Sequence, residues 1–150
     1  ELQTKKEMLH SQDLIIEATL PFNEKNGYKA ALKIAEDTTG LIFRSDSSLL
    51  SRVLINMIKN ALEASDEEDT VTVGATQRNN HLRFWVHNPG HIPRETQLQI
   101  FERSYTTKGR GRGLGTFSMK LLGENYLGGK VNFSSEEETG TTFWIDLPLD

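Results

Sequence analysis

The sequence predicts an α+β fold, a two-layer α/β sandwich in which helices cover one face of a mixed, mostly antiparallel sheet. Two patterns predict it. Apolar residues recur with the period of a helix around residues 49–65, whereas residues 70–76, 81–87 and 141–147 are rich in residues that favour strands. Short turns rich in Asn, Gly and Glu join these strand segments to their neighbours, which favours hairpins.

The composition describes a single soluble domain. The chain has 150 residues, 36% of them hydrophobic, which is long enough to bury a core of its own. It contains no cysteine, which excludes disulfides and thiolate metal sites and fits a reducing, cytoplasmic location. A net charge of −4 argues against nucleic acid as a partner. No apolar run is long enough to span a bilayer, so we expect no membrane contact by this segment, whether or not a parent protein is membrane-anchored.

The first elements are a helix and two short strands. Residues 1–19 are predicted to be helical, charged at first and apolar later, with a break at Asn26-Gly27. Residues 28–35 alternate between apolar and polar, which predicts a half-buried strand, and residues 41–44 predict a second one.

A central helix is predicted over residues 49–65, after N-cap residues at 45–47. Its apolar positions cover roughly 200° of the circumference, so we expect burial on most sides. On the narrow polar strip, Asn56, Asn60 and Glu63 stack along one line. Helix interiors disfavour Asn, so this row indicates a functional site slightly more than a solvent-exposed edge.

A long irregular segment follows the strand predicted over residues 81–87. Residues 88–112 contain only a short predicted helix near 95–101, and such a segment in a compact domain is usually functional. The next helix is predicted over 114–127, and residues 130–135 and 141–147 form the closing hairpin.

Glycines and cations alternate directly before that helix, in the sequence KGRGRGLGT. The glycines are Gly111, Gly113 and Gly115. The cations are Lys108, Arg110 and Arg112. Glycines in such a turn let backbone N–H groups approach an anion, and the helix adds its positive end, so the segment suits a polyphosphate. It is neither a Walker A loop nor a well-placed dinucleotide fingerprint, and a flexible basic linker is the less favoured alternative.

The third signal is VHNPGHIP at residues 86–93, at the end of a strand. Asn88 offers a carboxamide that can accept from an exocyclic amine and donate to a ring nitrogen, as Asn does with adenine. Gly90 allows a ring to pass close to the backbone. On this segment alone, a plain Asn-Pro-Gly turn would be the favoured interpretation.

Taken in order, these segments resemble the ATP-binding catalytic domain of sensor histidine kinases, within the superfamily of gyrase, the large heat-shock chaperone and mismatch-repair ATPases. The resemblance covers about residues 28–148. Its motifs are NMIKNALEA, similar to the N box; VHNPGHIP, similar to the first glycine box; IFERSYTTK, similar to the F box; GRGLGT, similar to the second glycine box; and GTTFWIDLP, similar to the closing glycine-threonine motif. Each motif is weak alone, and their order and spacing make the match strong.

The resemblance implies a site for ATP and Mg²⁺. Asn60 would ligate Mg²⁺, with Asn56 assisting one turn earlier, and Asn56, Asn60 and Lys108 would be the catalytic residues. Asn88 would bind the adenine amine, with Thr141 supporting it through water. The full set expected to bind ATP is Asn56, Lys59, Asn60, Glu63, Asn88, Gly90, Ile92, Phe101, Thr106, Thr107, Lys108, Arg110, Gly111, Arg112, Gly113, Leu114, Gly115, Thr116 and Thr141.

Within this set, Lys108 and the backbone of residues 111–115 would hold the terminal phosphates. Phe101 would anchor a lid over residues 105–112. Glu63 receives no firm role, because the family varies at that position.

The resemblance also implies a reaction and partners. The domain would be a protein-histidine kinase that transfers the γ-phosphoryl group of ATP to a histidine in a separate dimerisation domain, with a response regulator receiver domain as a further partner. We expect the acceptor histidine upstream of Glu1. Residues 1–20 are expected to be an N-terminal helical segment, a candidate tail of the dimerisation hairpin, and residues 21–150 the catalytic domain. A nucleotide-binding signalling module with little catalysis and an anti-sigma-type serine kinase are the alternatives.

Two details of the motifs bear on the chemistry. Water-splitting relatives hold a Glu where Asn56 stands, and an amide is a poor base near neutral pH, which favours transfer over hydrolysis. The first glycine box usually carries Asp where Asn88 stands, followed by two glycines rather than one. We therefore expect modest nucleotide affinity.

Overall fold

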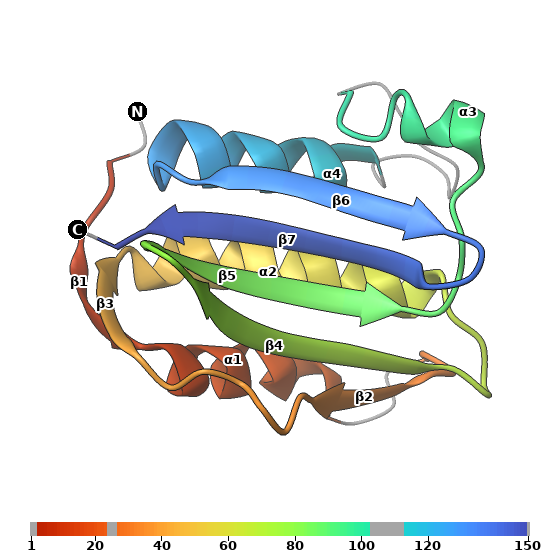
Figure 1. Ribbon diagram of the computed structural model, residues 1–150, viewed down its shortest axis with the longest axis horizontal. Helices are drawn as coiled ribbons and strands as arrows, with labels where there is room; N and C mark the ends of the chain where they lie inside the picture. Colours follow the sequence, from red (N-terminus) through yellow and green to blue (C-terminus); the bar gives the residue numbers. More distant parts are fainter. Residues whose placement is uncertain (1–2, 24–26, 103–112, 150) are drawn as a thin grey trace.

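The structure is a computed structural model that describes residues 3–23, 27–102 and 113–149, with side chains again from residue 115. In chain order its elements are β1 (Glu7–His10), α1 (Ser11–Thr19), the 3₁₀ turn η1 (Leu20–Phe22), β2 (Ala31–Ile34), β3 (Ile42–Ser45), α2 (Ser47–Glu63), β4 (Thr70–Arg78), β5 (His81–Asn88), α3 (Arg94–Gln97), α4 (Gly113–Lys120), the π-helix η2 (Leu121–Tyr126), β6 (Lys130–Glu136) and β7 (Gly140–Pro148) (Figure 1).

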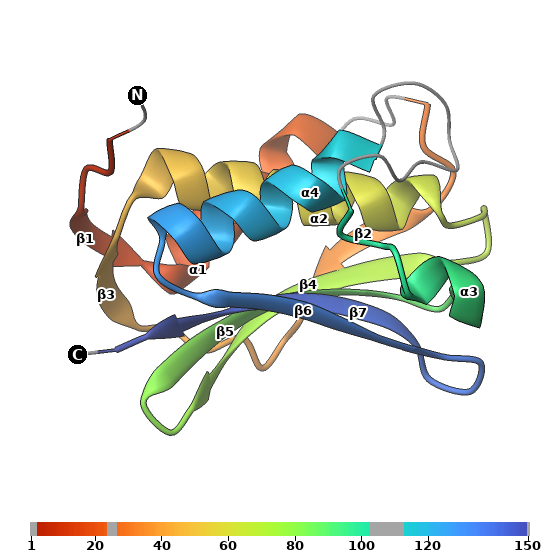
Figure 2. The same cartoon turned by 90° about the horizontal axis from the view of Figure 1, so that it is seen from above.

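The main sheet has five strands in the order β2-β4-β5-β7-β6. β2 runs parallel to β4, and the other three pairs are antiparallel. Figure 2 shows α1, α2 and α4 together on one face of this sheet, while no helix of the described residues covers the other face. The predicted α+β class, a mixed and mostly antiparallel sheet with helices on one face, is confirmed.

The helix α2 forms the centre of the core between sheet and flanking helices. Its buried residues are Leu49, Leu50, Val53, Leu54, Met57, Ile58, Ala61 and Leu62, which confirms the predicted apolar face. The helix begins because the carboxylate of Asp46 accepts a hydrogen bond from the Leu49 N–H at 3.0 Å, as an N-cap does. The strands β4 and β5 present alternate residues to this core, as a period of two requires.

The prediction of a helix over residues 1–19 is wrong for its first half. Residues 7–10 form β1, which pairs antiparallel with β3 as a separate two-stranded ribbon, so the second predicted strand also lies outside the main sheet. The helix begins only at Ser11. Residues 7–10 carry no strong period of their own, and the hydrogen bonds to β3 decide their conformation. The proposed division of the chain at residue 20 stays a prediction, and Leu14 and Ile15 of α1 are part of the domain's core.

Two helices differ from their predicted extent. The helix predicted near residues 95–101 is the four-residue α3. The helix predicted over residues 114–127 is α-helical to Lys120 and then π-helical. Within the π-helix, Gly123 lies against Val131 and Ile145, where an added Cβ would collide with Val131. In the part of the chain that the structure describes, no helix is long and apolar enough to cross a bilayer.

Candidate functional site

The C-terminal end of α2, the end of β5 and the start of β7 meet at one end of the sheet, on the right of Figure 1. On α2, Asn56, Asn60 and Glu63 are half-buried and Lys59 is exposed. Asn60 and Glu63 each have a partner within the chain. The carbonyl oxygen of Ala64, at the helix end, would lie 3.6 Å from a Cβ added at Gly90. The polar ridge of α2 therefore ends beside the loop that follows β5.

A directed chain of hydrogen bonds holds that loop. The Ile92 N–H donates to Ser135 Oγ at 2.8 Å, and Thr141 Oγ1 donates to the Gly90 carbonyl at 2.8 Å. Ser135 Oγ and Thr141 Oγ1 are 2.7 Å apart. Because the Thr141 proton is used on Gly90, Ser135 must donate to Thr141. Each hydroxyl therefore donates once and accepts, and the loop is tied to β6 and β7.

A second contact supports the same loop. Gln97 Nε2 on α3 donates to the Ile92 carbonyl at 2.8 Å and lies 3.3 Å from the Ser135 carbonyl. Sequence reasoning did not identify Ser135 or Gln97. Ser135 lies opposite Thr141 in the closing hairpin, so a prediction of the register of that hairpin would have identified Ser135. Gln97 has no comparable signal, because α3 is too short to show a period.

Asn88 is a buried polar residue of this end, with 5% of its surface exposed. Its backbone pairs with Thr141 in the sheet, but no described residue hydrogen-bonds its carboxamide. In the described part of the chain every fully enclosed side-chain nitrogen or oxygen has a partner. The polar atoms of Asn88 must therefore lie at its small exposed surface, where a ligand can reach both its donor and its acceptor.

Two glycines shape the surroundings of Asn88. Gly140 has a φ of +85°, and a Cβ there would collide with the Asn88 carbonyl and lie 2.9 Å from Pro89 Cα. Gly90 has no such φ, and a Cβ there would lie 3.2 Å from Asn88 Nδ2. The fold requires Gly140, whereas Gly90 keeps the approach to the carboxamide open.

Phe101 and the start of α4 are fastened to the same region. The Phe101 ring meets Phe133 and Phe143 edge-on, at centroid distances of 5.7 and 6.1 Å, and the Lys120 ammonium lies 4.8 Å from its centroid. The hydroxyl of Thr116 is buried and donates to the Ile100 carbonyl at 2.6 Å. A Cβ at Gly115 would meet no other atom within 4 Å, so packing does not require that glycine.

Part of the predicted set lies outside the described residues: Thr106, Thr107, Lys108, Arg110, Gly111 and Arg112. Gly113 and Leu114 belong to the first turn of α4. Among the described residues, the structure links Thr141 to Asn88 by strand pairing, to Gly90 by a hydrogen bond, and to Ile92 through the hydroxyl of Ser135. Asn60 and Glu63 approach this cluster along α2, while Asn56 is one turn further away and Phe101 is held in its own aromatic group.

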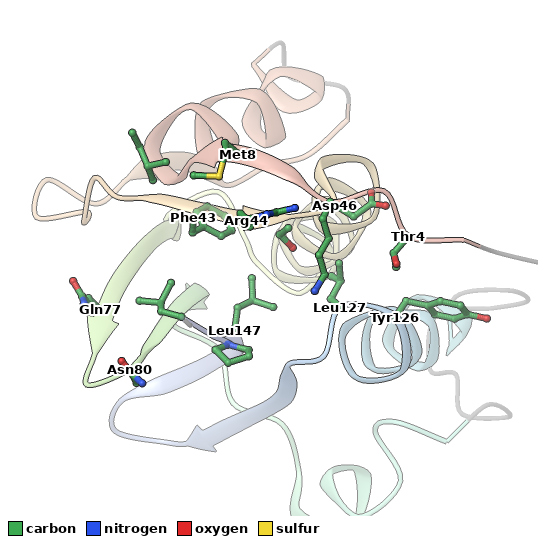
Figure 3. A pocket seen from close by; sticks show the side chains of 15 residues that line it. Thr4, Met8, Phe43, Arg44, Asp46, Gln77, Asn80, Tyr126, Leu127 and Leu147 are labelled. Carbon is green, nitrogen blue, oxygen red and sulfur yellow. The ribbon is translucent and has the colours of Figure 1, made fainter.

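A cavity of about 780 Å³ lies at the opposite end of the domain, between the β1–β3 ribbon and the ends of β7 and η2 (Figure 3). Lys6, Met8, Arg44 and Tyr126 are among its lining residues. None of the residues predicted to bind ATP lines it. This cavity is thus separate from the cluster around Asn88.

Residues 45–150 match the protein family described as Histidine kinase-, DNA gyrase B-, and HSP90-like ATPase. The chain is 33% identical over 116 residues to Sporulation kinase C of Bacillus subtilis (strain 168), covering 76% of this chain and 27% of that kinase. It is 30% identical over 145 residues to Sporulation kinase A of the same strain, covering 95% of this chain and 24% of that kinase. The chain therefore spans about a quarter of the length of these curated relatives.

The solved structures that are similar include histidine kinases. The catalytic domain of histidine kinase ThkA has a TM-score of 0.85 and 28% identity, with 97% of both chains covered. The structure of ThkA in complex with response regulator protein TrrA has a TM-score of 0.79 and 26% identity, covering 97% of this chain and 42% of that chain. The expected histidine kinase-like ATPase fold is confirmed.

Proposed function

The chain belongs to the histidine kinase-, DNA gyrase B- and HSP90-like ATPase family, and we propose that it is the ATP-binding catalytic domain of a two-component sensor histidine kinase. The proposed reaction transfers the γ-phosphoryl group of ATP to a histidine in a separate dimerisation domain. The observation that carries the proposal is the nearly buried Asn88 carboxamide, open to a ligand beside a hydrogen-bonded loop and the polar end of α2.

In this proposal the adenine ring lies over the loop at Gly90, and its amine meets the carboxamide of Asn88. Support comes from the hydrogen bonds of Thr141 and Ser135, which hold the loop in one shape before a ligand arrives. Preformed polar groups lose less entropy on binding than mobile ones. Thr141 can still accept one hydrogen bond, so a bridging water is its proposed contact with the base.

Asn60 is the proposed ligand of Mg²⁺, with Asn56 assisting from the preceding turn. Among the described residues no group of three or more His, Cys, Asp or Glu side chains could hold a metal ion. Mg²⁺ keeps several waters and is usually bound by one or two protein oxygens together with substrate phosphates, which a half-buried carboxamide fits. A carboxamide has two donor and two acceptor positions, so the partner of Asn60 within the chain does not by itself exhaust them. The ion would neutralise charge on the phosphates.

The terminal phosphates are assigned to the segment before α4. Lys108 is the proposed phosphate cation, and the backbone N–H groups of residues 111–115 are the proposed cradle, with Arg110 and Arg112 as further contacts. The support is the sequence pattern and the helix N-terminus that follows it, since α4 begins at Gly113. The basic segment would offset the four negative charges that a triphosphate carries.

Transfer, rather than hydrolysis, is the proposed outcome. Asn56 stands where a water-activating carboxylate would be needed, and a carboxamide does not accept a proton near neutral pH. The proposed acceptor is a histidine on a dimerisation domain outside residues 1–150, and the proposed onward partner is a response regulator receiver domain. The complex of the similar kinase ThkA with a response regulator supports the second partner. We also propose a cytoplasmic location, where ATP is available.

The test is transfer of ³²P from γ-labelled ATP to an added histidine-containing dimerisation domain. We expect Asn60→Ala to lower transfer by about 100-fold or more, because the metal and phosphates lose their position. Asn125→Ala, an exposed carboxamide on η2, is the matched control and should leave transfer unchanged. Nucleotide binding without any transfer by the unaltered chain would contradict the kinase and support the signalling module.

A further inference from the structure

The Asn88 side chain has a chemical property that adenine binding alone does not require. Its carboxamide has one acceptor oxygen and one donor nitrogen at the small exposed surface of the residue. No described residue hydrogen-bonds either atom, so nothing in the described chain selects one orientation of the terminal amide. Rotation by 180° about the last side-chain bond exchanges the two atoms without displacing the backbone, which is paired with Thr141.

The two orientations match two kinds of purine. A 6-aminopurine has a donor amine at C6 and an acceptor at N1, which pair with the oxygen and nitrogen of a carboxamide. A 6-oxopurine has the reverse, an acceptor oxygen at C6 and a donor N1–H, which pair with the rotated carboxamide. A carboxylate at this position would only accept, so it could make just one of these two hydrogen bonds with either base, from the 6-amine of the first or from N1–H of the second.

The neighbours of Asn88 do not restore a preference. The Thr141 hydroxyl proton is used on the Gly90 carbonyl, so Thr141 does not donate to a base. The Ser135 proton is used on Thr141. Gly90, beside the Asn88 carboxamide, adds no polar side chain. Of these described residues, Asn88 is therefore the one that can pair with either kind of purine.

We infer that this site binds purine nucleoside triphosphates of both classes, those with a 6-amino and those with a 6-oxo group, because the Asn88 carboxamide can pair with either. The inference rests on the proposed function, in which Asn88 faces the C6 edge of the base. It extends that function from ATP to inosine triphosphate as a ligand of the same site.

The experiment compares the dissociation constants of ATP and inosine triphosphate, with Mg²⁺, by calorimetry on the whole 150-residue chain. In the unaltered chain we expect the two constants to agree within about tenfold, since each base makes two hydrogen bonds to the carboxamide. Asn88→Leu, of similar size, removes both hydrogen-bonding atoms and should weaken both nucleotides by about tenfold or more. Asn125→Leu makes the same change at an exposed carboxamide and should leave both constants unchanged.

A third ligand tests the inference without any variant, in case Asn88→Leu fails to fold. Purine riboside triphosphate has no substituent at C6, so the unaltered chain should bind it several-fold more weakly than either other nucleotide. Equal binding of all three, or a preference of 100-fold or more for ATP over inosine triphosphate, overturns the inference and leaves ATP binding intact. No binding of any of the three overturns the nucleotide site itself, and with it the inference.

Discussion

Asp46 and Asn88 are two polar residues at opposite ends of the domain, and they are almost equally buried, with 6% and 5% of their surfaces exposed. Asp46 precedes α2, whose 17 residues span about 25 Å, and Asn88 lies near the other end of that helix. The oxygens of Asp46 accept from the Leu49 and Lys5 N–H groups at 3.0 and 2.7 Å. No described residue hydrogen-bonds the Asn88 carboxamide.

The difference between the two residues separates a structural role from a proposed binding role. Burial removes a polar group from water, and the fold must then supply partners or lose stability. At Asp46 the backbone supplies them, so the residue stabilises the start of a helix. At Asn88 no described residue supplies a partner for the carboxamide, whose polar atoms lie at the small exposed surface and are available to a ligand. The presence of partners, rather than the degree of burial, distinguishes the two ends.

The largest effect on stability is expected from Gly140→Ala, because the new methyl group would displace the backbone of Asn88. Alanine would have to adopt a φ of +85° and would collide with the Asn88 carbonyl, so we expect the free energy of unfolding to fall by about 3 kcal/mol. Urea denaturation measures it. Gly128→Ala is the matched control: it has a φ of +72° but no neighbouring atom within 4 Å, so it should cost clearly less. Equal losses would mean that Asn88 is not held by this contact.

Asp46→Ala tests whether Asp46 stabilises the fold without contributing to ATP binding. Loss of the cap and of the bond to the Lys5 N–H should lower the free energy of unfolding by about 2 kcal/mol, because two backbone donors lose their acceptor. The affinity for ATP should stay within about twofold, since the cap is a whole helix length away. Denaturation and calorimetry on the same sample measure both. A large fall in affinity of the folded variant would break the proposed separation of the two ends.

Thr141→Val removes the hydroxyl in the middle of the directed chain. The Gly90 carbonyl and the Ser135 hydroxyl each lose a partner, so we expect about 1–2 kcal/mol of destabilisation and a several-fold fall in ATP affinity. Thr142→Val, the neighbouring residue on the other face of β7, is the control and should change each by little. Binding as tight as in the unaltered chain would show that the shape of the loop does not matter.

Gly90→Ala should have the smallest effect and should affect binding alone. Its backbone is in an ordinary conformation, but the new methyl group would lie 3.2 Å from Asn88 Nδ2 and narrow the approach of a ring. We expect about three- to tenfold weaker ATP binding, or roughly 1 kcal/mol, and an unfolding free energy within about 0.5 kcal/mol of the unaltered value. A stability loss without a change in binding would assign Gly90 to the fold.

Much of the fold could be predicted because each main element has its own period. The apolar face of α2 and the strands β4, β5 and β7 follow from residues within one element. The strand β1 could not be predicted in this way. Its four residues become a strand through pairing with β3, more than 30 residues away along the chain, where Glu7 lies opposite Ser45 and His10 opposite Ile42.

For the candidate site, too, part could be predicted from the sequence and part could not. The sequence alone placed Asn88, Gly90 and Thr141 in one site, because their types and spacing resemble a known set of motifs. It could not show that Ser135 links Ile92 to Thr141, since those bonds join residues up to 43 positions apart. It also could not distinguish Asp46 from Asn88. Local sequence sets which groups are polar and which face they lie on, whereas only packing of distant segments decides which polar groups receive a partner and which are left for a ligand.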